Sequence, residues 1–198
     1  ARATGATALV EKDLTLAFAK KIEATVTAKT GARVLLSRSA DVHLSTVERP
    51  SFANEARADL FLSLHLNASP SPEAKGFRVY YHDPSGAEMI APALEAAPAI
   101  PWSAAQRDVE GRSAHFADLL RESLAAKVTL ADRGVKRVPL AVLEGATCPA
   151  ALVELGFLSN HDEALALSTD AVQDAVAEAV ADAIVKMDAS LAEAEGTR

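Results

Sequence analysis

The sequence predicts an α/β fold, a single three-layer α/β/α domain with a mostly parallel central sheet. Short apolar runs typical of buried strands alternate along the chain with longer segments of helical periodicity. No internal repeat and no domain-scale linker interrupts the 198 residues, and 49 % of them are apolar. That length and composition are sufficient for one ordinary hydrophobic core.

The helices are predicted from apolar residues that recur every three or four positions. They span 12–30, 44–57, 112–128 and 161–167, and a last helix follows Asp170. In the first helix the recurring residues are Leu14, Phe18, Ile22 and Val26, and Gly31 ends it. Pro50 lies in the second helix, where it marks either a kink or the helix start.

The strands are predicted from short apolar runs bounded by turn-forming residues. They span 33–36, 60–68, 76–81, 140–143 and 150–154. Segment 60–68 is an almost continuous apolar run, typical of a strand buried on both faces. The polar and basic segment 131–137 is predicted as a loop, and the proline-rich segment 85–101 as a surface excursion anchored by Trp102.

Composition excludes several classes of protein. A net charge of −7, few aromatic residues and the lack of a Lys/Arg cluster argue against a nucleic-acid partner. Cys148 is the only cysteine, which excludes an internal disulfide and a thiolate zinc site. No apolar run is long enough for a transmembrane segment. The chain begins at Ala1 without methionine, so the lack of a signal peptide carries no information.

Three polar side chains stand at the ends of predicted elements. Glu11 begins the first helix, His65 comes near the end of strand 60–68, and Glu154 closes strand 150–154. Ligands of α/β sheets bind beyond the carboxyl ends of strands, and a strand glutamate is costly unless solvated, paired or bound to a cation. Histidine and carboxylates also form catalytic zinc sites. The alternatives are a helix-dipole role for Glu11 and a hydrogen-bonded core histidine.

The motifs resemble, in order, those of the zinc-dependent N-acetylmuramoyl-L-alanine amidases of the type 3 family. Glu11-Lys12-Asp13 resembles the second zinc-ligand motif, and 58–68 matches the third, whose histidine binds zinc. Segment 149–160 matches the closing motif, whose glutamate is catalytic. Further matches are Arg38-Ser39-Ala40-Asp41 with Leu44, Arg49 and Ala53-Asn54, and Asp132–Lys136, which resembles a loop near the substrate groove.

The resemblance implies hydrolysis of the amide between N-acetylmuramic acid and L-alanine in peptidoglycan, with a zinc ion (Zn2+) as cofactor. The implied residues are Glu154 as general base, Glu11 and His65 as zinc ligands, and Asn67, Arg133 and Lys136 as substrate-binding residues. A turn-forming Asn67 and a solvated basic loop are the alternatives for the last three. The resemblance also implies peptidoglycan as partner, a possible activator protein, and a periplasmic or extracellular location.

One departure from the family pattern leaves two interpretations open. The family begins with a Gly-His-Gly-type turn that supplies the first zinc ligand, and no histidine precedes Glu11 here. We favour an N-terminally incomplete amidase catalytic domain over 1–198. The alternative is a degenerate, non-catalytic domain that binds or regulates at peptidoglycan. His43, His82, His115 and His161 are candidates for a substitute ligand, although surface or capping roles are favoured for them.

Some regulated members of the family carry an inhibitory helix over the zinc. The corresponding region here is 83–111, which is broken by prolines, so we do not predict a stable plug. Glu88, Glu95 and Glu110 are the carboxylates in this region that could reach the metal.

Overall fold

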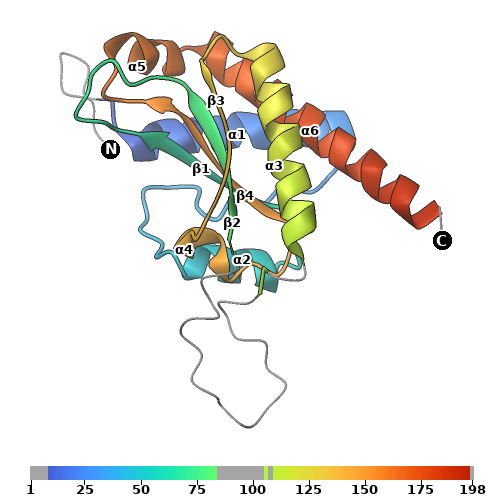
Figure 1. Ribbon diagram of the computed structural model, residues 1–198. Coiled ribbons are helices and arrows are strands. Elements are labelled where there is room, and N and C mark those ends of the chain that lie inside the picture. Colours follow the sequence, from blue (N-terminus) through green and yellow to red (C-terminus); the bar gives the residue numbers. More distant parts are fainter. Residues whose placement is uncertain (1–8, 84–104, 107–108, 197–198) are drawn as a thin grey trace.

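The computed structural model describes residues 9–83, 105–106 and 109–196, in which a four-stranded sheet lies between helices (Figure 1). The strands are β1 (Phe61–Asn67), β2 (Phe77–His82), β3 (Asp132–Val138) and β4 (Ala150–Phe157), in the spatial order β1-β4-β2-β3. β1 pairs with β4 and β2 with β3 in parallel, whereas β2 and β4 are antiparallel. The predicted α/β class with a mostly parallel sheet is confirmed.

One face of the sheet is covered by three long helices, α1 (Glu11–Thr30), α3 (Glu110–Lys127) and α6 (Asp170–Gly196). Alternate residues of each strand point into this layer, because side chains of a strand alternate between faces. They include Leu64 and Leu66 of β1, Val79 of β2 and Val153 of β4. These residues and the helices form the main hydrophobic core, in which Phe18 and Leu120 are fully buried.

The opposite face carries a thinner layer made of the short helices α2 (Glu48–Glu55) and α4 (Ala141–Glu144). Here Val142 and Leu143 of α4 pack on Leu152 of β4, with Tyr80 at the margin of this small cluster. The Asn54 amide holds α2 to the end of α4, since it donates to the Gly145 carbonyl at 2.8 Å and accepts from the Thr147 N–H at 2.9 Å. Figure 1 shows the two short helices together at one end of the strands.

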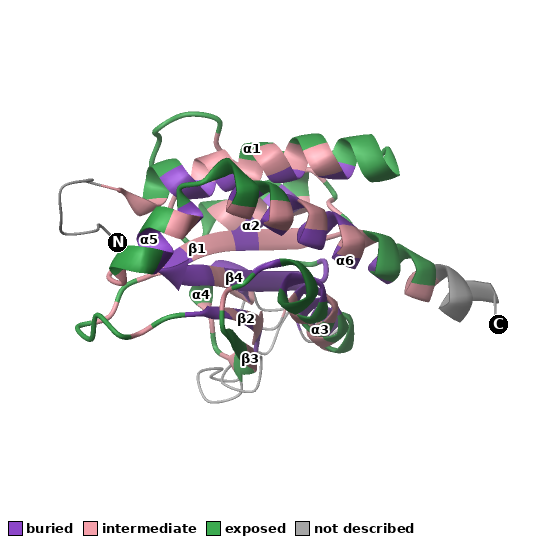
Figure 2. Cartoon of the chain, turned by 90° about the horizontal axis from the view of Figure 1, so that it is seen from above, coloured by how far each residue is buried: buried purple, intermediate pink, exposed green. Residues whose placement is uncertain are grey.

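β4 is the central strand that both layers share. Seven of its eight residues are buried, and Glu154 is the exception (Figure 2). The strand therefore needs apolar residues on both faces, which explains its continuous apolar sequence. Beyond it, α5 (His161–Leu167) begins after Asn160, whose side chain caps the helix by accepting from the Glu163 N–H at 3.0 Å.

The predicted helices are confirmed, although α2 is shorter than expected. It spans eight residues, and Pro50 lies in its first turn, so the proline marks a helix start rather than a kink. Ser45 and Glu48 form a reciprocal cap before it: the Ser45 N–H donates to Glu48 Oε2 at 2.7 Å and the Glu48 N–H donates to Ser45 Oγ at 3.3 Å.

Three of the strand and loop predictions were wrong. Residues 33–36 form no strand. A short strand needs a neighbour to pair with, and none of the described strands lies beside them. Segment 131–137, predicted as a loop, contains β3, an edge strand whose exposed positions tolerate charged residues. Residues 140–143, predicted as a strand, largely form α4, since a short apolar run fits a buried helix turn equally well.

The proline-rich segment 85–101, Trp102 and the carboxylates Glu88 and Glu95 lie outside the described residues. Glu110 begins α3 and pairs with the Arg137 guanidinium at 2.8 Å. Within the described ranges, every helix is too short or too polar to cross a membrane.

Candidate functional site

His65 and Glu154 lie side by side because β1 and β4 run parallel in register. The two residues are direct cross-strand partners, so their side chains emerge on the same face of the sheet. That face is the one under the thin α2 and α4 layer. On the other side of β4, Arg78 of β2 is the direct partner of Glu154. His65, Glu154 and Arg78 therefore lie side by side across three neighbouring strands.

Glu11 reaches the same place from the first turn of α1. Its Oε1 lies 3.0 Å from His65 Nδ1 and accepts from the Leu66 N–H at 3.2 Å. Because a carboxylate only accepts, the imidazole donates from Nδ1, and a neutral ring then keeps its lone pair on Nε2. Burial would raise the pKa of the Glu11 carboxyl, but the bonds from His65 and Leu66 help to lower it to about 2. Glu11 is therefore an anion at neutral pH.

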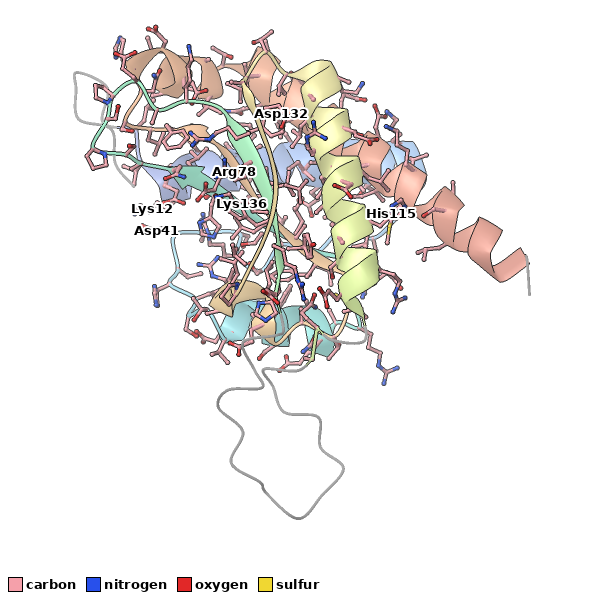
Figure 3. All side chains as sticks on the ribbon, viewed as in Figure 1. Lys12, Asp41, Arg78, His115, Asp132 and Lys136 are labelled. Atoms are coloured by element: carbon pink, nitrogen blue, oxygen red, sulfur yellow. The ribbon has the colours of Figure 1, made fainter. Side chains whose placement is uncertain are left out.

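The loop before α2 fixes the start of α1. Lys12 forms an ion pair with Asp41, and Figure 3 shows the two side chains meeting beside β1. Arg38 adds a bond from Nη2 to the Lys12 carbonyl at 2.5 Å and another to Thr15 Oγ1 at 3.1 Å. These contacts hold the turn of α1 that carries Glu11 against the end of the sheet.

One oxygen of Glu154 is held by two donors. Asn67 Nδ2 lies 2.5 Å from Glu154 Oε2, and the Tyr80 hydroxyl donates to the same oxygen at 2.9 Å. Burial, together with the bond to Glu154, raises the pKa of Tyr80, so its hydroxyl remains a donor well above neutral pH. The carboxylate is thereby oriented by its Oε2, while Oε1 takes no part in these bonds.

A pocket of about 820 Å³ opens on this face and is lined by His65, Tyr80 and Glu154. Its other side comes from the segment before α2 and from α2 itself, which supply His43 and Arg49. Apolar side chains complete the wall, namely Leu44, Leu140, Val142 and Leu152. The pocket therefore combines an apolar wall with a few convergent polar groups, as ligand sites commonly do.

The two basic substrate-binding candidates both lie on β3, the edge strand. Lys136 is the cross-strand partner of Tyr80, so its side chain emerges on the pocket face, near Arg78 of the neighbouring strand (Figure 3). The Arg133 guanidinium lies over the Phe157 ring, 5.0 Å from its centroid, and donates to the Lys75 carbonyl at 3.2 Å. Their assignment as substrate-binding residues stays a prediction, as does that of Asn67.

The donors Glu11 and His65 fit a zinc ion in kind and spacing. Carboxylate oxygen and imidazole nitrogen are common zinc ligands, and two ligands of a tetrahedral zinc lie about 3.3 Å apart. Oε1 and Nδ1 lie 3.0 Å apart, close to that separation, and zinc would replace the proton that Nδ1 now shares with Oε1. Catalytic zinc sites normally have three protein ligands, and no group of three or more His, Cys, Asp or Glu in the described ranges could hold a metal. Residues 1–8 contain none of these four residue types.

The four candidate substitute histidines occupy different places. His43 lines the pocket together with His65. His82 is buried on the same face of the sheet, and its Nδ1 accepts from the Leu140 N–H at 3.0 Å. His115 lies 3.2 Å from Ser190 Oγ, between α3 and α6, and His161 is the exposed first residue of α5.

Sequence reasoning did not identify Tyr80 or Glu163 as contributors to this site. The Glu163 carboxylate is buried and accepts from the Gly76 N–H at 2.6 Å and the Phe157 N–H at 2.8 Å, which fixes the end of β4 to the start of β2. The strand alternation places Tyr80 on one face, but only the antiparallel pairing of β2 with β4 brings it to Glu154. No local sequence signal reports that pairing.

The family model, similar sequences and similar structures all point to the same family. A family model described as N-acetylmuramoyl-L-alanine amidase matches residues 1–186. The endolysin of Bacillus phage SPP1 is 32 % identical over 166 residues, covering 84 % of this chain and 54 % of the endolysin. The amidase LytC of Bacillus subtilis (strain 168) is 32 % identical over 166 residues, 84 % of this chain but 29 % of LytC. The chain thus spans about half of the first relative and less than a third of the second.

Solved structures agree with this result. The catalytic domain of CwlV, an N-acetylmuramoyl-L-alanine amidase from Bacillus (Paenibacillus) polymyxa var. colistinus, is 30 % identical with a TM-score of 0.69. The alignment covers 89 % of this chain and 83 % of that domain. An N-acetylmuramoyl-L-alanine amidase from Clostridium difficile 630 is 25 % identical with a TM-score of 0.76, over 96 % of this chain and 90 % of the other.

Proposed function

The chain belongs to the N-acetylmuramoyl-L-alanine amidase family, and from this premise we propose that it hydrolyses the amide between N-acetylmuramic acid and L-alanine in peptidoglycan. The observation that carries the proposal is the Glu154 carboxylate, oriented by two donors and placed beside His65 at the pocket. Peptidoglycan as substrate places the activity in the periplasm or outside the cell. An activator protein stays a prediction from the resemblance.

We assign Glu11 and His65 as the residues that hold zinc. When bound, zinc would acidify the attacking water and polarise the scissile carbonyl. The Leu66 N–H and the loop contacts of Lys12 and Arg38 keep the Glu11 carboxylate in position for this role. Such bonds to a ligating carboxylate orient it before the metal binds.

Glu154 is proposed as the general base. It takes a proton from the attacking water and returns it to the amine that leaves as the amide bond breaks. Tyr80 and Asn67 both donate to Oε2, so they leave Oε1 for the attacking water and fix the carboxylate against rotation. A base held in this way loses little orientational freedom before reaction, which favours proton transfer.

Asn67, Arg133 and Lys136 are proposed to contact the substrate. Lys136 lies on the pocket face and offers an ammonium group to carboxylates of the stem peptide. Arg133 would contribute those of its N–H groups that do not bond to the Lys75 carbonyl. Asn67 holds Glu154 and stands at the last position of β1.

A second candidate function is a non-catalytic domain that binds peptidoglycan. The two-residue donor set favours it, because two protein ligands should hold zinc more weakly than the three of a catalytic site. Such a domain would keep the pocket and its affinity for muramoyl peptides. It would lack hydrolysis at any zinc concentration.

Zinc stoichiometry and dye release from labelled peptidoglycan separate the two functions. For an amidase, the zinc-loaded chain releases dye, and Glu154→Gln lowers the rate by about 100-fold or more while the zinc content is unchanged. Glu122→Gln, an exposed carboxylate on α3, is the matched control and should leave both unchanged. Peptidoglycan binding without zinc and without dye release would instead support the binding domain. Loss of zinc in Glu154→Gln would show that Glu154 is a ligand.

A further inference from the structure

Arg49 places a guanidinium group in the candidate pocket, and none of the described residues binds it. It lies in the first turn of α2 and lines the pocket with His65 and Glu154. Across the described ranges, no hydrogen bond or ion pair joins its side chain to another group. Every fully buried side-chain N or O atom in those ranges has a partner, so the N–H groups of Arg49 are open to the pocket or solvent.

The nearby carboxylates already have donors. Glu48, next to Arg49 in sequence, accepts from the Ser45 N–H in the helix cap. Glu154 accepts from Asn67 and Tyr80, and Glu11 accepts from His65. The chain has 27 Asp and Glu against 20 Lys and Arg, so acidic partners are not scarce. A cation left without one beside the catalytic base is therefore available to an external anion.

We propose that Arg49 binds a free carboxylate of the stem peptide and thereby selects substrates that carry it. This inference rests on the proposed function, since it concerns the same pocket and the same muramoyl peptide. A guanidinium offers a planar fork of N–H donors that matches a carboxylate in a bidentate pair. The side chains of Leu44, Leu140 and Val142 line the same pocket and could contact the apolar parts of the peptide.

The position of Arg49 also suggests how it would act on specificity. In the proposed function the scissile amide lies at His65 and Glu154, and Arg49 of α2 lines the same pocket. A carboxylate further along the peptide would reach Arg49 while the amide stays at Glu154. Amidation of that carboxylate removes the charge and one acceptor oxygen, so the peptide would lose this anchor without changing its shape.

Binding measurements test this proposal without turnover. All proteins carry Glu154→Gln, and calorimetry compares a soluble N-acetylmuramoyl peptide with free carboxylates and the same peptide with those carboxylates amidated. We expect Arg49→Gln to weaken binding of the free-carboxylate peptide by about tenfold or more. The amidated peptide should bind both proteins alike, because the lost partner is then missing in each. Arg33→Gln, an exposed arginine outside the pocket, removes the same charge as the matched control.

Three results would overturn the inference. Equal affinity of the Arg49 and Arg33 variants, with the muramoyl peptide still bound, would reject the role of Arg49 and leave the amidase proposal intact. Binding of neither peptide to the parent protein would reject both. The comparison of free and amidated peptides on the parent needs no Arg49 variant, so equal affinity for the two also rejects the role if that variant fails to fold.

Discussion

The two faces of the central sheet contrast in thickness and in chemistry. One face lies under α1, α3 and α6, and the residues that it presents are almost all apolar and buried. The other lies under two short helices, and along β4 it presents Ala150, Leu152 and then Glu154. The change from apolar to charged occurs within one strand face, at the point where α4 no longer covers it. The face under α1, α3 and α6 thus forms the main core, and the opposite face of the same four strands carries the candidate site.

This division explains how the sheet holds charged groups near its centre. Glu154 would be costly within a thick apolar layer, because a buried carboxylate needs donors or water. On the thin face it has Asn67, Tyr80 and the open pocket. The thick face supplies the rigidity that keeps β1, β4 and β2 in register. The site depends on that register, since three of its residues meet only through strand pairing.

The largest expected effect is on the thick face. Phe18→Ala, at a fully buried position of α1, should lower the free energy of unfolding by about 3–5 kcal/mol, because it leaves a large cavity. Leu152→Ala, in the small cluster on the pocket face, should cost about 2 kcal/mol, since the pocket beside it lets water replace part of the lost contact. Urea unfolding of both variants measures the difference. If Leu152→Ala lowered the free energy of unfolding as much as Phe18→Ala or more, the face under the long helices would not be the main source of stability.

A smaller effect is expected from a hydroxyl on the pocket face. Tyr80→Phe removes one donor to Glu154 Oε2 and should reduce kcat for peptidoglycan hydrolysis by about tenfold with little change in KM, because the base is less well oriented. The free energy of unfolding should change by less than about 1 kcal/mol. Tyr81→Phe is the matched control, since the adjacent residue points into the thick face. An equal loss of kcat in Tyr81→Phe would show that the effect is structural.

The fold was predictable from the sequence where a pattern is strong and local. The helical period of Leu14, Phe18 and Ile22 and the apolar run of β4 each depend on one packing environment, and the structure agrees with both. β3 was missed because an edge strand needs few apolar residues, so Arg133, Lys136 and Arg137 resembled a loop. Segment 140–143 was assigned wrongly because four apolar residues do not distinguish a strand from a helix turn.

The candidate site was predictable through its motifs but not through its contacts. Glu11, His65 and Glu154 stand at the ends of elements, and the structure places Glu11 against His65 and His65 beside Glu154. Tyr80 joins them only because β2 runs antiparallel to β4, and Arg49 only because α2 folds over the pocket. These are long-range pairings, which local periodicity does not encode.

The smallest expected effect concerns the pH dependence of the thin face. His82 is buried there, and burial lowers its pKa. The negative charges of Glu144, Asp83 and Glu110 act in the opposite direction but do not outweigh burial. Its Nδ1 must stay unprotonated to accept from the Leu140 N–H, which starts α4. Well above the ordinary histidine pKa of about 6.5 the ring is neutral in the folded and unfolded states, and its contribution to stability is complete. As pH falls below that value, the unfolded chain binds a proton that the folded state resists, so stability declines.

His82→Asn isolates this contribution, because asparagine keeps an acceptor for the Leu140 N–H and does not titrate. Urea midpoints at about pH 7.5 and about pH 5.5 should fall further in the parent protein than in the variant. The other four histidines are the same in both proteins, so the difference between the two slopes belongs to His82. Identical slopes would mean that α4 opens readily enough to hydrate the ring. In that case α4 would be a mobile cover over the pocket. The two faces of the sheet would then differ in mobility as well as in composition.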